Sequence, residues 1–138
     1  MTLTCGVLLA ASITISRPAY GADDHAAIRT AVFDYFEGIN EVSRVRLERA
    51  FDSDAELKSV NASGALAAEP IADAIARWMH GDASTRRGEV LSVDLFGDAV
   101  GGQFARVVFD FDGAYIDLLT LAKLQGQWKI IDKVFVRK

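Results

Sequence analysis

The sequence predicts an α+β domain with an antiparallel sheet, and three observations support that prediction. Apolar residues recur at helical spacing near the N-terminal end of the predicted domain. The segment 103–138 holds three alternating apolar runs separated by Asp112-Gly113 and Gln125-Gly126, and Asp-Gly between such runs is a strong hairpin signal. Helices therefore precede most of the strands, an order typical of α+β proteins.

Three helices are expected. Asp23-Asp24 can cap the first, whose apolar positions are spaced four, four and three residues apart and so share one face. These positions are Ile28, Val32, Phe36 and Ile39. Ser43 can cap a short second helix. The third helix begins after Pro70 and ends before Gly81, because glycine commonly stops helices.

Strands are expected at 56–60, at 65–69, at 90–96 and in the three runs of the C-terminal segment. Residues that favour turns separate these runs. The additional turns are Asp52-Ser53-Asp54, Ala62-Ser63-Gly64 and Gly97-Asp98. Gly101-Gly102 indicates a bulge or a strong bend.

Composition and motifs exclude several classes of protein. At 138 residues, 51% of them hydrophobic, the chain can bury one core. Its net charge of −4 and the lack of a basic stripe argue against nucleic acid as a partner. No apolar stretch reaches the roughly 20 residues that span a membrane as a helix. Two distant histidines and one cysteine predict no metal site, and without a phosphate-binding loop no cofactor is expected.

The first 21 residues have the pattern of a signal peptide. The apolar run 6–15 is broken by Ser16-Arg17-Pro18, and Ala19 and Gly21 supply small residues at the positions that a signal peptidase reads. Arg17 follows the run instead of preceding it, which departs from that pattern. A helical or disordered tail and a misassigned start codon are the alternatives. Cleavage before Ala22 would leave residues 22–138 as a single domain that is periplasmic or secreted.

Two-residue turns would fix the register of the C-terminal strands and divide their residues between two faces. The mixed face holds Phe104, Arg106, Val108, Asp110, Tyr115, Asp117, Leu119, Leu121, Trp128, Ile130, Asp132 and Val134. The apolar face holds Ala105, Val107, Phe109, Phe111, Ile116, Leu118, Thr120, Ala122, Ile131, Lys133 and Phe135. Since the helices can cover only one of these largely apolar faces, we expect a homodimer through a sheet face. A monomer with an apolar back is the alternative.

Periodicity leaves open which face meets the helices. If the mixed face points inward, Arg106 lines a cavity together with Asp117 and Asp132 and can pair with either carboxylate. If the apolar face points inward, these charged residues lie in water.

The segment 115–135 reads Y-I-D-L-L-T-L-A-K-L-Q-G-Q-W-K-I-I-D-K-V-F. This segment and the order of elements resemble the nuclear transport factor 2-like superfamily, and within it the putative lumazine-binding and SnoaL-like branch. The resemblance implies a cone-shaped, curved antiparallel sheet, also called a cystatin-like roll, around a pocket that three helices close. It also implies dimers formed through the sheet and favours the mixed face as the pocket face. The superfamily hosts enzymes, binding proteins and assembly modules.

Ketosteroid isomerase, an enzyme of this superfamily, holds an enolate with a tyrosine and a protonated aspartic acid. An ungapped comparison places Tyr35 and Asp117 at those two positions. It places Ser59 where that enzyme has its general base, and a serine cannot transfer a proton near neutral pH unaided. The resemblance therefore implies a hydrogen-bonding pair in an apolar cavity and speaks against steroid isomerisation.

The first functional hypothesis is an exported domain that binds a small apolar or aromatic ligand. The expected ligand-binding residues are Tyr35, Trp78, Arg106, Asp117 and Asp132. The second hypothesis is an acid–base enzyme, such as an isomerase, cyclase or dehydratase, and the third is a non-catalytic assembly module. Two roles are open for Asp117: a protonated donor in an apolar pocket, or half of a buried ion pair that ties two strands.

Overall fold

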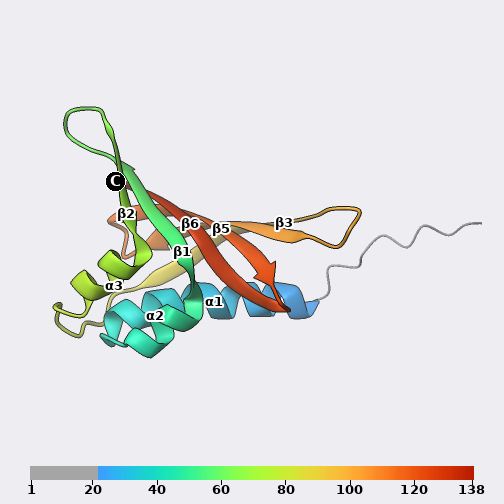
Figure 1. The fold of residues 1–138 in the computed structure, drawn as a ribbon. Helices are drawn as coiled ribbons and strands as arrows, with labels where there is room; N and C mark the ends of the chain where they lie inside the picture. Colours follow the sequence, from blue (N-terminus) through green and yellow to red (C-terminus); the bar gives the residue numbers. More distant parts are fainter. Residues whose placement is uncertain (1–21) are drawn as a thin grey trace, which may run out of the picture.

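Three helices and six strands follow one another in the predicted order (Figure 1). The computed structural model describes residues 22–138, so the predicted signal peptide, residues 1–21, lies outside the described residues. The elements are α1 (Ala22–Asn40), α2 (Arg44–Ala50), β1 (Phe51–Val60), β2 (Leu66–Pro70), α3 (Ile71–Trp78), β3 (Gly88–Gly97), β4 (Gln103–Phe111), β5 (Tyr115–Leu124) and β6 (Gln127–Arg137). The α+β class is confirmed.

The helices form where the sequence pattern predicts them. All four apolar residues of the stripe on α1 are buried in the core. α2 begins after Ser43, whose side chain accepts a hydrogen bond from the backbone N–H of Arg46 at 3.4 Å. The two helices approach each other closely at Gly38. A Cβ atom at this position would lie only 2.8 Å from Cγ of Leu47, so glycine permits the close packing.

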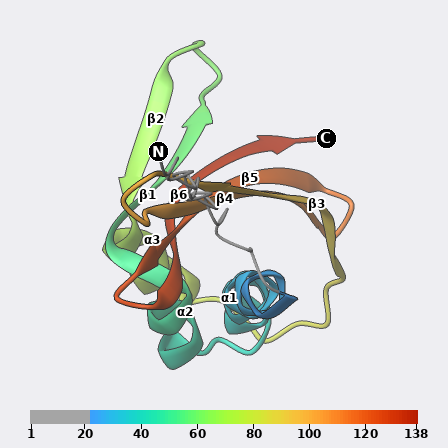
Figure 2. The ribbon, with the colours of Figure 1, turned by 90° about the vertical axis from the view of Figure 1, so that its right-hand side faces the viewer.

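The six strands form one sheet in the order β2-β1-β6-β5-β4-β3. The four pairs that the hairpins and the β3–β4 connection make are antiparallel, as predicted, whereas β1 runs parallel to β6. The sheet curves over α1, and the helices lie on its concave side (Figure 2). β1 starts earlier than predicted, so Asp52-Ser53-Asp54 lies within the strand instead of forming a turn. Its register against β6 shifts between Phe51 and Glu56.

The hairpin between β4 and β5 differs from the predicted two-residue turn. Its loop has three residues, Asp112 to Ala114, and Phe111 pairs with Tyr115 instead of Ala114. Asp112 and Gly113 have positive φ angles of 59° and 68°. Glycine adopts this conformation without strain, and aspartate tolerates it better than most residues do.

The additional loop residue changes which β4 residues share a face with β5, because successive side chains point to opposite sides of a sheet. A second shift, between the pairs made by Thr120 and Leu121, brings Lys133 to the concave face where Asp132 was expected. The concave face holds Ala105, Val107, Phe109, Phe111, Asp117, Leu119, Leu121, Trp128, Ile130 and Lys133. It therefore combines residues from both predicted faces, and the expectation that the mixed face lines the pocket as a unit is wrong.

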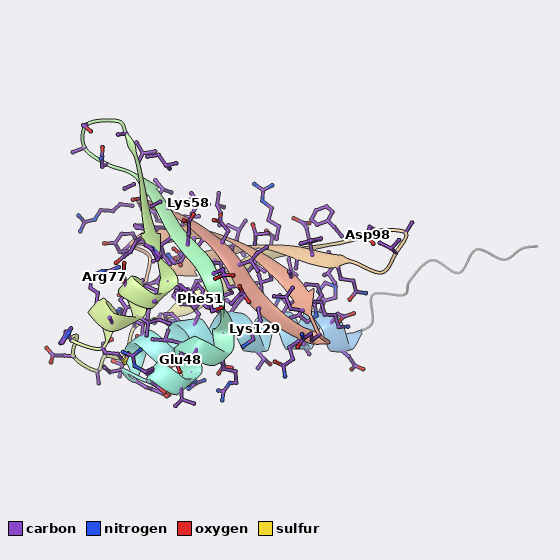
Figure 3. All side chains as sticks on the ribbon, viewed as in Figure 1. Glu48, Phe51, Lys58, Arg77, Asp98 and Lys129 are labelled. Atoms are coloured by element: carbon purple, nitrogen blue, oxygen red, sulfur yellow. The ribbon has the colours of Figure 1, made fainter. Side chains whose placement is uncertain are left out.

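The convex face of the sheet is exposed and partly apolar. Among its exposed apolar side chains are Phe96, Phe104, Val134 and Val136. The β1–β2 and β3–β4 hairpins extend beyond the helices (Figure 1), and Asp98 lies at the tip of the second (Figure 3). Within residues 22–138, no helix has both the length and the apolar character needed to cross a membrane.

Candidate functional site

A cavity of about 400 Å³ lies between the concave face of the sheet, the C-terminal half of α1 and the end of α3. This volume falls in the range typical of small-molecule sites. Each layer of the fold contributes to its wall. Among the lining residues are Tyr35 and Ile39 of α1, Trp78 of α3, Phe111 of β4, Asp117 of β5 and Lys133 of β6.

Three polar side chains meet in this cavity. The hydroxyl group of Tyr35 donates a hydrogen bond to Oδ2 of Asp117 at 2.8 Å, and Nζ of Lys133 donates one to Oδ1 at 2.6 Å. The exposed fractions of the three residues are small: 1% for Tyr35, 0% for Asp117 and 5% for Lys133. Because a buried carboxylate needs compensating donors, this geometry favours the ion-pair role for Asp117, with Lys133 as its cation in place of Arg106.

Burial shifts the acid–base properties of two members of this cluster. It lowers the pKa of the Lys133 ammonium group, and the carboxylate of Asp117 offsets part of that change. Burial and then the charge of Asp117 raise the pKa of the Tyr35 hydroxyl group well above its usual value. Tyr35 therefore remains a hydrogen-bond donor at neutral pH, and Lys133 releases its proton more readily than a lysine in water does.

The walls beside this cluster are aromatic. The ring of Tyr35 lies 6.0 Å from the ring of Trp78 and 6.0 Å from that of Phe111. Nζ of Lys133 lies 4.4 Å from the ring centre of Phe135, which is within the range of a cation–π contact. Flat, polarisable groups pack well against such walls.

Two arginines add positive charge to the cavity wall. Arg77 projects from α3 (Figure 3) and donates two hydrogen bonds to Glu69, at 3.1 and 2.7 Å. The guanidinium group of Arg86 lies 5.6 Å from the ring centre of Phe111. Among the described residues, no carboxylate forms a salt bridge with Arg86, so its charge is available to a bound anion.

The loop that bears Arg86 is fastened to the end of α1 by Asn40. The side-chain oxygen of Asn40 accepts a hydrogen bond from the Ser84 hydroxyl group at 3.1 Å, and its backbone oxygen accepts one from the N–H of Ser84 at 2.8 Å. The side-chain amide of Asn40 donates to the backbone oxygen of Arg86 at 3.4 Å. These contacts account for a buried asparagine and fix the position of Arg86.

Three of the five predicted site residues line the cavity: Tyr35, Trp78 and Asp117. The hydrogen-bonded pair that the resemblance implied, Tyr35 with Asp117, is present. Ser59, the residue at the position of the general base in ketosteroid isomerase, is not among the lining residues.

The other two predicted site residues, Arg106 and Asp132, lie on the convex face, so the expectation that they line the cavity with Asp117 is wrong. Arg106 is opposite Thr120, which is opposite Asp132, so the two charged residues lie in one cross-strand row on the convex face. Asp132 forms a salt bridge with Lys58 of β1. The two register shifts described above are the cause.

Sequence reasoning did not identify Lys133, Arg77 and Arg86 as residues of the cavity. A signal for Lys133 was present, because it is the one charged residue on the predicted apolar face. A lysine in such surroundings needs a buried partner. The arginines had no comparable signal, since α3 and the following loop bring them to the cavity only through the tertiary fold.

This arrangement can hold a small ligand through aromatic packing and through donors on Lys133 and Arg86. Both oxygens of Asp117 accept hydrogen bonds from the protein, and its ion pair with Lys133 lies at the cavity wall. Within residues 22–138, no group of three or more histidine, cysteine, aspartate or glutamate residues could hold a metal ion.

Comparison with known proteins places the chain among structures of one fold. A protein of unknown function from Silicibacter pomeroyi, described as NTF2-like, is 26% identical, with a TM-score of 0.72 over 85% of this chain and 98% of that one. An NTF2-like protein of unknown function from Shewanella baltica is 20% identical, with a TM-score of 0.71 over 88% and 98%. An uncharacterised protein from Caulobacter vibrioides with a cystatin-like fold is 18% identical, with a TM-score of 0.57 over 85% and 91%.

None of the curated proteins matches this chain. The sequence profile of the family described as putative lumazine-binding matches residues 23–136, which is nearly all of the described part. The chain therefore belongs to the putative lumazine-binding family of the nuclear transport factor 2-like superfamily.

Proposed function

We propose that this domain binds a small planar ligand that bears an anionic or carbonyl group. The observation that supports the proposal most directly is the cavity of about 400 Å³ with aromatic walls and a buried Tyr35–Asp117–Lys133 cluster. Apolar pockets with a few convergent polar groups are the usual form of small-molecule sites.

Arg86 and Lys133 favour an acidic ligand or one that accepts hydrogen bonds, and Asp82 is a further carboxylate among the lining residues. Arg77 and Lys133 are paired with protein carboxylates, whereas Arg86 stacks on Phe111 without such a partner among the described residues. Lys133 uses one of its three N–H donors on Asp117, which leaves donors for a ligand oxygen. A carboxylate or ring carbonyl between Arg86 and Lys133 would satisfy both groups.

The family's description fits the same chemistry. Lumazine is a planar bicyclic heteroaromatic compound with two ring carbonyl groups, and the matching family is described as putative lumazine-binding. Aromatic walls would pack on its faces, and cationic donors would meet its oxygens. Lumazine is therefore a suitable first probe, and 2-naphthoate is a second probe of similar size that places a carboxylate on a flat ring system.

Isothermal titration calorimetry of the domain with lumazine and with 2-naphthoate tests the proposal. Arg86→Ala should weaken the binding of 2-naphthoate about tenfold or more, because it removes a charge-assisted contact. Arg87→Ala is the matched control, since Arg87 is the neighbouring arginine and is not among the lining residues. Arg106→Ala, on the convex face, should likewise leave affinity unchanged. Binding of neither probe, or equal losses in all three variants, would overturn the proposal.

We also propose that the domain is exported and forms a dimer. The convex face exposes apolar side chains around Leu118, and a second copy of this chain would cover them, since its own helices occupy the opposite side of the sheet. The signal-peptide pattern of residues 1–21 supports a periplasmic or secreted location for this dimer.

A further inference from the structure

Lys133 differs from the other lysines of this protein. The chain has five lysines, and the other four lie at least partly exposed: Lys58, Lys123, Lys129 and Lys138. Each of these four has an oxygen partner near the surface, such as Asp132 for Lys58. Lys133 alone is buried and lines the cavity. A ligand in the cavity therefore meets a single lysine side chain.

The partner of Lys133 can take up its proton. Nζ of Lys133 and Oδ1 of Asp117 are 2.6 Å apart, and Asp117 is fully buried. Moving the proton along this hydrogen bond gives a neutral amine and a carboxylic acid without a change in net charge. Burial disfavours charged forms, so the neutral pair is more accessible here than in water. Tyr35 donates its hydrogen bond to the other oxygen of Asp117.

We propose that Lys133 forms an imine with an aromatic aldehyde or ketone that occupies the cavity. This inference rests on the proposed function, because the carbonyl compound has to enter the same cavity. A lysine amine in an apolar pocket is a well-suited nucleophile for a carbonyl carbon. The aromatic walls formed by Trp78, Phe111 and Phe135 select for an aryl group beside that carbon.

The atoms and charges of this step balance within the cluster. Asp117 takes the proton of the Lys133 ammonium group, and the neutral amine attacks the carbonyl carbon to form a carbinolamine. The carboxylic acid then returns a proton to the departing hydroxyl group, water leaves, and a C=N bond forms. The iminium cation takes the place of the ammonium group beside the Asp117 carboxylate, so the ion pair persists. The sum is one ammonium group and one carbonyl compound giving one iminium group and one water molecule.

Reductive trapping of the full domain tests this inference. The protein is incubated at neutral pH with 2-naphthaldehyde, and sodium borohydride supplies the hydride that converts an imine to a stable secondary amine. Intact mass should show one naphthylmethyl group per chain, and peptide mapping should place it on Lys133. An excess of 2-naphthoate should suppress the labelling, because both compounds need the same cavity.

Two variants sharpen the test. Lys133→Arg keeps the positive charge and removes the nucleophile, so the single label should disappear, whereas Lys58→Arg on β1 should label as the wild type does. Label spread evenly over the five lysines of the wild type would overturn the imine, and this readout requires no variant to fold. Binding of 2-naphthoate without any label on Lys133 would overturn the imine alone. Failure of both binding and labelling would overturn the proposed function as well.

Discussion

Lys133 and Asp117 form an ion pair across two neighbouring strands, with Nζ 2.6 Å from Oδ1 and both side chains buried. Their backbone positions are diagonal, because Asp117 pairs with Phe135 and Lys133 pairs with Leu119. The same two groups that tie β5 to β6 also face the cavity. A structural role and the proposed ligand role therefore coincide in one contact.

Removing the Asp117 charge should destabilise the domain. Asp117→Asn leaves the Lys133 ammonium group buried without its counter-charge, and breaking such a pair costs about 3–5 kcal/mol. Urea unfolding followed by circular dichroism measures this change. Asp94→Asn, on the convex face, is the control and should shift stability by about 0.5 kcal/mol or less. A fully stable Asp117→Asn variant would contradict the ion-pair role.

Tyr35 should make the domain sensitive to alkali. The pKa of its hydroxyl group is raised in the folded state above the unfolded value of 10.0. The folded state therefore binds more protons above about pH 10, and stability falls as pH rises from there. In Tyr35→Phe this fall should be smaller. Unfolding free energies across that pH range measure it, with Tyr115→Phe, a second cavity-lining tyrosine, as the control. Equal slopes in both variants would contradict the assignment.

Asp34 should contribute to stability at neutral pH and lose that contribution in acid. It lies on α1 and accepts hydrogen bonds from Arg49 at 2.6 Å and from Arg46 at 3.2 Å. The contact with Arg49 lowers the pKa of Asp34 below 3.8, so its contribution is complete above that value and disappears as pH falls through the folded pKa. Because Arg49 is half exposed, Asp34→Asn should cost about 1–2 kcal/mol at pH 7.

Acid unfolding measured by urea titration at several pH values checks this expectation. Asp34→Asn should lose less stability between neutral pH and about pH 3 than the wild type does. The exposed Asp54 provides the control, since Asp54→Asn should retain the dependence of the wild type. An unaltered acid profile in Asp34→Asn would show that Asp34 is not a source of that dependence.

A charge in the middle of the convex face should separate the proposed dimer. Leu118→Glu places a carboxylate where a second copy would bury an apolar surface, and an unpaired buried charge is strongly unfavourable. Analytical ultracentrifugation should show monomers for this variant and dimers for the wild type. Val45→Glu, on the exposed side of α2, should remain dimeric. A dimeric Leu118→Glu variant would place the interface elsewhere.

Export should produce a chain that starts at Ala22. Intact mass of the protein recovered from the periplasm or the medium measures this directly, and it should match residues 22–138. A protein that retains Met1 would show that the segment is not removed and would leave the proposed location without support.

The helices and most strands could be predicted because each depends on local pattern. The stripe from Ile28 to Ile39 occurs where apolar spacing predicts it. The cap at Ser43 and the turn at Gln125-Gly126 occur where their residue types predict them. The parallel pairing of β1 with β6 could not be predicted. This pairing joins two strands that are distant in sequence, so no turn between them indicates it.

In the candidate site, an error of one residue in strand register moves a side chain to the opposite face of the sheet from the one predicted. Tyr35, which the family resemblance indicated, and Trp78 lie on helices, where no sheet register intervenes, and both line the cavity. Arg106 and Asp132 lie on strands, where one additional residue in a loop or one bulge moves a side chain to the other side. Lys133 faces the cavity because of the register shift between Thr120 and Leu121. Register, more than residue type, limited the prediction.

The position of β6 also has a consequence for the order of folding. β6 is the last strand in the described sequence, yet it lies between β1 and β5 in the middle of the sheet. A nascent chain that ends before Gln127 has no strand to join its first hairpin to β5, so β1 and β2 have no neighbour in the sheet at that stage. We expect this domain to fold only after synthesis of its final strand. Such a delay keeps the chain unfolded for longer, which is consistent with the proposed export, in which the chain crosses a membrane before it folds.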